Sequence, residues 1–190
     1  MKKTITLLIF LIGAGINQVR SAEILYSVLA DGCGGCHGTK GVSAPHMPTI
    51  AGLNKDYLRT VMLQYKTGER SSTIMGRLAR GYTDAQIDAL ASYFAAQTWV
   101  SPFQEVNERL LKRGEKIHRE KCEMCHKDNG RYMNAETPRL AGQAIAHLRI
   151  VLDEYRDEER RVMKKYMKKL MRKIRSRDVE ALANFYANQR

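Results

Sequence analysis

Two short segments of this chain hold residues whose types and spacing could do chemistry: CGGCH at residues 33–37 and CEMCH at residues 122–126. Together they use all four cysteines and two of the five histidines. This spacing is typical of c-type haem attachment, in which two thiols form thioethers with the vinyl groups of one porphyrin. The imidazole that follows then lies under the iron and can ligate it. The sequence therefore predicts two covalently bound haem c groups, with tethers Cys33, Cys36, Cys122 and Cys125 and with iron ligands His37 and His126.

The first 21 residues are typical of a secretory signal peptide. Lys2 and Lys3 precede an apolar run over residues 4–15, and a small residue, Ser21, lies at the expected cleavage site. We expect cleavage after Ser21 or Ala22. An uncleaved membrane anchor is the alternative, but the apolar run is short for a bilayer span. No later segment is apolar enough to cross a membrane, so we expect export from the cytoplasm.

Disulfide bonds and a zinc site are the two alternatives to haem attachment. Cysteines in an exported chain often form disulfides, and four thiols that meet in one place can hold zinc. The histidine directly after each pair and the 85 residues between the pairs favour haem. A c-type absorption spectrum separates these interpretations.

The chain is basic, and the excess of charge is uneven. The net charge is +12, and removal of Lys2, Lys3 and Arg20 with the signal peptide leaves +9. Residues 99–190 carry 22 Lys and Arg against 14 Asp and Glu, whereas residues 23–98 carry 7 against 6. An exported protein meets little nucleic acid, so we expect no nucleic-acid partner. An acidic protein or an anionic surface is the better match.

Helical periodicity predicts an all-α fold, because no long alternating β-pattern occurs. Asn54 or Asp56 begins one helix and Gly68 ends it. Thr83 and Gln86 have the spacing of a capping box at the start of another. The remaining helical segments expected from the pattern are 22–30, 103–120, 144–155 and 179–186.

The two halves are related by duplication. The haem motifs are 89 residues apart, residues 58–70 match 148–160 at an offset of 90, and residues 87–97 match 179–189 at 92. The offset changes by only three residues along the chain, so each half is expected to be a domain with one haem packed among a few helices. The expected boundaries are 1–21 for the signal peptide, 22–98 for the first domain, 99–103 for the linker and 104–190 for the second domain.

Each iron needs a second axial group, and thioether sulfur favours the reduced ion. In the first half, Met75 precedes the last helix, whereas Met47 is close to the haem motif and Met62 lies on a helix face. In the second half, the offset of 92 gives Met167, although counting forward from the preceding match leaves Met163 equally near. The prediction is Met75 for the first iron and Met167 for the second, with Met163 as the alternative.

The ligand histidines need a hydrogen bond to the other ring nitrogen, and the carbonyls of Pro48 and Pro138 recur at the right place to accept it. His46, His118 and His147 have no copies in the opposite half, so we expect packing or surface roles for them.

One segment of the second half is strongly basic. Residues 160–177 hold ten Lys and Arg with no acidic residue between them, and their doublets recur every four residues. This predicts an amphipathic helix with a basic outer face. The face is either simply solvated or a docking surface for an acidic partner.

Two longer segments, STIMGRLARGY at 72–82 and YRDEERR at 155–161 followed by Met-Lys-Lys, resemble the dihaem cytochrome subunit of flavocytochrome c sulfide dehydrogenase. The tandem plan itself is similar to cytochrome c4. The resemblance implies two tandem class I cytochrome c domains in a periplasmic heterodimer. A flavoprotein subunit with FAD oxidises sulfide, and this subunit takes up single electrons and passes them to other redox proteins. The chain departs from that family in having a short segment before its final helix.

The leading hypothesis is therefore a non-catalytic electron-transfer subunit. A free shuttle similar to cytochrome c4, or an electron acceptor for thiosulfate dehydrogenase, is the alternative within the same chemistry. A dihaem peroxidase is less favoured, because no Glu or His in the expected distal loops breaks the repeat.

Overall fold

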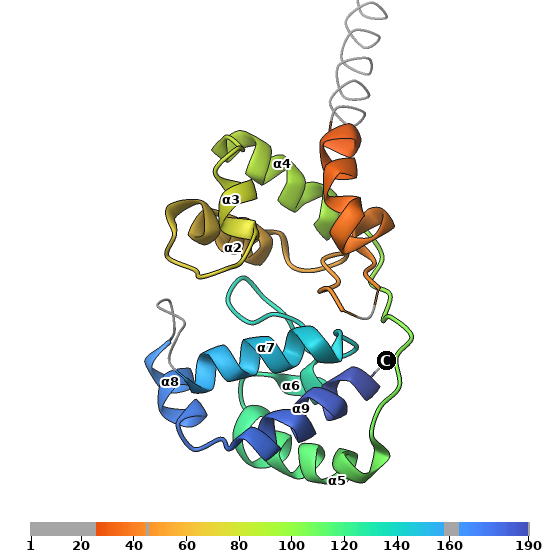
Figure 1. The fold of residues 1–190 in the computed structure, drawn as a ribbon, viewed down its shortest axis with the longest axis vertical. Coiled ribbons are helices and arrows are strands. Elements are labelled where there is room, and N and C mark those ends of the chain that lie inside the picture. The colour runs from red at the N-terminus through yellow and green to blue at the C-terminus, as the bar shows by residue number, and fades with distance from the viewer. Residues whose placement is uncertain (1–25, 45, 158–163, 190) are drawn as a thin grey trace, which may run out of the picture.

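The computed structural model describes residues 26–44, 46–157 and 164–189, and it contains helices and no strand within these ranges (Figure 1). The predicted all-α class is confirmed. The predicted signal peptide and the alternative ligand Met163 lie outside the described residues. The elements are an unlabelled helix over 26–37, η1 Thr39–Gly41, α2 Lys55–Thr67, α3 Met75–Ala79, α4 Asp84–Ala95, α5 Glu108–Ile117, η2 His118–Cys122, α6 Lys127–Gly130, α7 Ile145–Arg156, α8 Lys165–Met171 and α9 Ser176–Asn188.

The helices form two domains, one above the other in Figure 1. The upper domain holds helix 26–37 with α2, α3 and α4, and the lower domain holds α5 to α9. Residues 98–107 join them without forming a helix. None of the described helices is both long and apolar enough to span a membrane.

The predicted helix ends of the first domain are present. The Asn54 side chain accepts a hydrogen bond from the amide of Tyr57 at 3.1 Å, and Gly68 ends α2 with φ of 78°. The capping box is also formed, since Thr83 Oγ1 accepts from Gln86 N at 3.2 Å and Gln86 Oε1 accepts from Thr83 N at 2.8 Å. The apolar face of α4, the helix that this capping box begins, buries Ile87, Leu90, Ala91 and Phe94.

In the second domain, α9 is the central helix, and α5 and α7 pack against it. Gly114 allows α5 to approach closely, because a Cβ at this position would overlap the carbonyl of Ala181 and the side chain of Phe185. The helix predicted from residue 103 begins only at Glu108. The side chain of Asn107 caps this helix. The main-chain N–H of Asn107 donates to Asn184 Oδ1 at 2.7 Å, which fixes the chain before the first turn.

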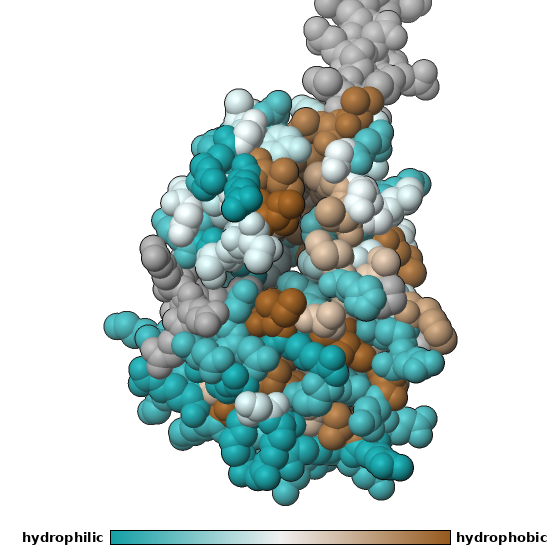
Figure 2. Space-filling model, in the orientation of Figure 1, coloured by the Kyte–Doolittle hydropathy of each residue, from teal (hydrophilic) through white to brown (hydrophobic). Residues whose placement is uncertain are grey.

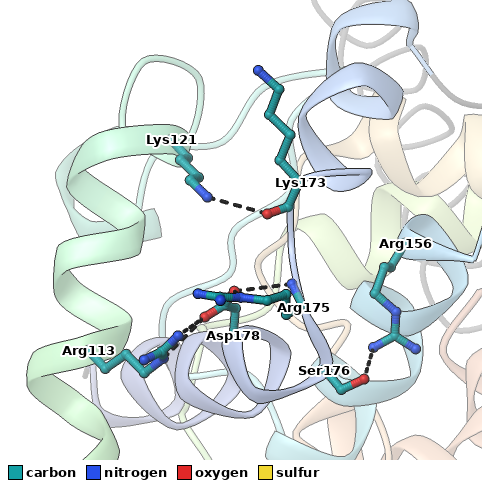
Figure 3. Close-up of polar contacts among 7 residues, drawn as sticks. All are labelled: Arg113, Lys121, Arg156, Lys173, Arg175, Ser176 and Asp178. Carbon is teal, nitrogen blue, oxygen red and sulfur yellow. Dashed lines mark hydrogen bonds and ion pairs between the residues drawn. The ribbon is translucent and has the colours of Figure 1, made fainter.

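A buried carboxylate holds α5 to the start of α9 (Figure 3). Asp178 accepts from Arg113 Nε at 3.1 Å and, on its other oxygen, from the amide and Nε of Arg175 at 3.1 and 3.2 Å. Nearby, Lys121 Nζ donates to the carbonyl of Lys173 at 3.5 Å. These contacts fix the turn that links α8 to α9.

The duplication extends to individual hydrogen bonds. The carbonyl of Gly41 accepts from the amides of Ile50 and Ala51, and the carbonyl of Gly130 accepts from the equivalent pair in the second domain. Gly52 donates to the carbonyl of Phe94 at 2.8 Å, and its counterpart repeats this contact with Tyr186 at the same distance. The same loop is thus closed by the same bonds in both domains.

The second domain differs by one inserted residue just before its cysteines. The buried residue that precedes the motif is Ala30 in the first domain and His118 in the second, 88 residues later, whereas the cysteines are 89 apart. The extra residue is taken up by the π-helical turn η2, marked by the hydrogen bond from Glu123 N to His118 O at 2.9 Å. Such turns are a common way to accommodate an insertion within a helix.

Candidate haem-binding sites

The first motif lies at the end of helix 26–37. Cys33 is half-buried, Cys36 is exposed and His37 is buried as the last helical residue. The Nδ1 of His37 lies 2.9 Å from the carbonyl oxygen of Pro48, so the ring donates there. The predicted orienting role of Pro48 is confirmed. Its hydrogen bond leaves Nε2 as the nitrogen available to a metal.

Burial determines the charge of both motif histidines. It lowers the pKa of His37, against a smaller opposing effect of the Pro48 carbonyl. Burial, together with the neighbouring His118, lowers the pKa of His126 to about 4. Both imidazoles are therefore neutral at pH 7, which is the form that ligates iron.

The second motif has a different local backbone. Cys122 ends the π-helical turn, and His126 has left the helical region with φ of −97° and ψ of 58°. Within the described part of the chain, Nδ1 of His126 is buried without a hydrogen-bond partner. The predicted contact with the Pro138 carbonyl is therefore absent. Two local differences accompany this absence: His126 lies outside a helix whereas His37 ends one, and His126 is 12 residues from Pro138 whereas His37 is 11 residues from Pro48.

In each motif the first cysteine is half-buried and the second is exposed. Cys122 is half-buried, and burial raises its pKa to about 11 against smaller opposing effects of Tyr186 and Lys121. Burial also raises the pKa of Cys33, with Cys36 adding to the effect. None of the four cysteines is in a disulfide, so each is available for a thioether.

A buried polar network lies beside the second motif. His118 is 0% exposed, its Nδ1 lies 2.9 Å from the Tyr186 hydroxyl, and its ring is 5.1 Å from that of Phe185. The carboxylate of Glu123 lies against its Nε2. The packing role expected of His118 is thus observed. The sequence does not predict this network; the one signal for it is that Tyr186 occupies the position of Phe94 in the first domain.

The methionines fall into distinct environments. Met75 is half-buried at the first position of α3, and Met167 is half-buried in α8, where it packs against the second core. Met171 is 1% exposed and belongs to that core. Met124 is 63% exposed.

The register of the last two helices relates Met75 to Met167. The capping positions of α4 and α9 are 92 residues apart. In the turn before α4, Tyr82 N donates to Ala79 O. In the turn before α9, Ile174 N donates to Met171 O, and these residues are also 92 positions further along the chain. Ala79 and Met171 are both fully buried. An offset of 92 places Met167 at the position of Met75.

These residues fit the group that the motifs predict: each domain offers two unpaired thiols, one neutral imidazole and one half-buried thioether. The cytochrome c family model matches the chain twice, over residues 26–97 and 111–189. This chain belongs to the cytochrome c family. It has two tandem class I cytochrome c domains and two covalently bound haem c groups.

The crystal structure of reduced recombinant cytochrome c4 from Pseudomonas stutzeri is similar to this protein over both domains. The two superpose with a TM-score of 0.78 at 26% identity, over 87% of this chain and 97% of that one. The thiosulfate dehydrogenase electron acceptor of Stutzerimonas stutzeri is 30% identical in an alignment of 168 positions, which covers 82% of this chain and 78% of that protein. This cytochrome is therefore c4-like.

The cytochrome subunit of sulfide dehydrogenase from Chlorobaculum tepidum is more similar over a shorter range. It is 45% identical over 67 residues, which are 35% of this chain and 61% of that protein. The chain therefore matches somewhat less than two thirds of the length of this relative. Because these relatives are electron-transfer subunits or carriers, the cytochrome is an electron-transfer protein and not itself an enzyme.

Proposed function

We propose that this cytochrome is the dihaem subunit of a periplasmic sulfide dehydrogenase. In this proposal it forms a heterodimer with a flavoprotein that carries FAD, accepts electrons singly and passes them to another redox protein. The observation that carries the proposal is the 45% identity to the cytochrome subunit of a sulfide dehydrogenase. Residues 1–21 are proposed to be the signal peptide that directs export.

The proposed haem contacts follow the duplication. Cys33 and Cys36 tether the first haem, and Cys122 and Cys125 tether the second. The neutral rings and the unpaired thiols support this assignment. When bound, haem c supplies the one-electron redox change. The proposed axial ligands are His37 with Met75 and His126 with Met167.

The second methionine can be tested by paired substitutions. Met167→Ala is expected to remove the weak far-red sulfur-to-iron band of one haem, because the thioether is its source. Met163→Ala is the comparison variant and is expected to leave that band intact. The assignment fails if the band is lost only in the Met163 variant.

The partner is proposed to dock on the basic side of the second domain. From Lys164 to Arg177 the chain has eight basic residues and no acidic one. Hydrophilic side chains cover most of the visible surface of this domain in Figure 2. We define the basic surface by its exposed members, since a partner with an acidic face would associate faster with them. They are Lys164, Lys165, Lys169, Arg172, Lys173, Arg175 and Arg177.

A second candidate is the role of electron acceptor for a thiosulfate dehydrogenase. It is favoured by the longer match to a protein of that name, which covers 82% of this chain. The two candidates share the electron-transfer chemistry and differ only in the donor.

Isolation from the native periplasm distinguishes the two donors. A stoichiometric flavoprotein that co-purifies, and haem reduction upon addition of sulfide, are expected for the sulfide dehydrogenase. Reduction by thiosulfate through a separately purified dehydrogenase, with no flavin in the preparation, would instead support the second candidate. A preparation reduced through neither route contradicts both.

A further inference from the structure

The side chain of Gln143, in the second domain, forms hydrogen bonds with the main chain of the first domain. Gln143 lies just before α7, and its side chain reaches Thr49, which is 94 residues away in sequence. Its Nε2 donates to the carbonyl of Thr49 at 2.7 Å, and its Oε1 accepts from the amide of Thr49 at 2.9 Å. Both residues are buried, with exposed fractions of 4% and 0%. One side-chain amide thus satisfies both main-chain groups of a residue in the other domain.

The peptide unit held in this way is the one that orients the first motif histidine. The amide of Thr49 and the carbonyl of Pro48 belong to a single planar peptide group. Gln143 Oε1 accepts from its N–H, and His37 Nδ1 donates to its C=O at 2.9 Å. The three groups form a continuous chain of hydrogen bonds from Gln143 through the peptide to His37. Bonds in such a chain polarise and strengthen one another in a buried setting.

Among the described residues, no side chain of the first domain makes the equivalent contact with the second. At the position of Gln143 the first domain has Leu53, which cannot form either bond. Nδ1 of His126 is buried without a hydrogen-bond partner in the described ranges. The hydrogen-bond chain therefore links a side chain of the second domain to the motif histidine of the first, with no counterpart in the opposite direction among the described residues.

From this geometry we infer that Gln143 is a positioning residue for the first haem, acting through the Pro48–Thr49 peptide on His37. The inference rests on the proposed role of His37 as an iron ligand. A stronger hydrogen bond from Nδ1 makes the imidazole more basic, and a more basic ligand stabilises oxidised iron. Contact between the domains therefore lowers the reduction potential of the first haem relative to that of the same haem without Gln143.

The test is Gln143→Leu in the full dihaem protein, because leucine is the residue that the first domain uses at this position. Potentiometric titration is expected to show the first haem shifted to a more positive potential and the second unchanged. Hydrogen exchange at the Thr49 amide is expected to become at least tenfold faster, since its acceptor is lost. Met75→Ala, which perturbs the first haem alone, identifies the signals that belong to it.

Gln104→Leu is the matched control. Gln104 bonds to the carbonyl of Gln143 at 3.0 Å and to the amide of Ile145 at 2.8 Å, but it does not reach Thr49. It is expected to leave both potentials unchanged. If Gln143→Leu fails to incorporate both haems, Gln143→Asn shortens the side chain by one methylene and is expected to shift the first haem in the same direction.

An unshifted first haem in folded Gln143→Leu or Gln143→Asn overturns the inference. An equal shift of both haems also overturns it, because that result indicates general loosening. The assignment of His37 is checked separately in the unmodified protein, where its ring protons must show hyperfine-shifted NMR signals. Their absence would reject the ligand assignment and not the hydrogen-bond chain.

Discussion

Asp178 is a buried carboxylate that joins two helices of the second domain. It is 3% exposed and bonds to Arg113 on α5 and to Arg175 at the start of α9. Burial alone would raise its pKa, but the hydrogen bonds from the two arginines lower it from 3.8 to about 2. Because each unit of pKa difference corresponds to about 1.4 kcal/mol, the ionised carboxylate stabilises the folded state by about 2–3 kcal/mol at neutral pH.

Asp178→Asn keeps the shape of the side chain and removes its charge. We expect it to reduce the free energy of unfolding by about 2–3 kcal/mol at pH 7, measured by urea unfolding followed by far-UV circular dichroism. A depressed folded-state pKa gives stability that is present above the unfolded value of 3.8 and is lost as the pH falls toward 2. The difference between the two proteins should therefore be constant from pH 5 to 8 and shrink below about pH 4.

Asp157→Asn is the matched control. Asp157 is exposed and pairs with Arg156 at 2.8 Å, and exposed pairs contribute little. We expect no measurable change in stability from this substitution. A loss in Asp178→Asn that is missing at pH 7, or that persists undiminished at pH 2, would refute the reasoning.

Three further predictions concern the second domain. Gly114→Ala should destabilise it by roughly 1–3 kcal/mol in thermal unfolding, because the added Cβ overlaps α9. Gly32→Ala in the open first helix should instead be stabilising, and equal effects of the two would contradict the packing argument. Tyr186→Phe should reduce the free energy of unfolding by about 1–3 kcal/mol, since it leaves His118 Nδ1 buried without its partner; an unchanged value would show that the bond is dispensable. Charge reversal at Lys169 and Lys173 should slow association with an acidic partner about tenfold at low salt in stopped-flow experiments, with little effect at 0.5 M salt; a salt-independent effect would argue against electrostatic docking.

Features fixed by neighbouring residues were predictable from the sequence. The haem motifs depend on spacing within a few residues, and the caps at Asn54 and Thr83 depend on side chains that reach amides three residues ahead. The internal offset then transferred each expectation from one domain to the other. Helices at α2, α4, α7 and α9 were therefore expected within a few residues of where they lie.

Features fixed by tertiary contact were not predictable in the same way. The start of α5 at Glu108 depends on Asn184, which is far away in sequence. The bond between Gln143 and Thr49 needs the two domains to meet. The expectation that Pro138 would orient His126 assumed a strict repeat, but His126 lies outside the helical region and is 12 residues from Pro138, whereas His37 is 11 residues from Pro48.

The π-helical turn η2 also determines where the length of the second domain can change. An α-helix turns about 100° per residue, so deleting a residue within α5 would rotate Gly114 away from α9. Deleting one residue inside η2 would instead restore the ordinary helical spacing of the first domain, with two residues between Ala30 and Cys33. The turn therefore separates the helix that packs on the core from the motif that holds the haem. Insertions and deletions in this family should concentrate there, where neither side has to rotate.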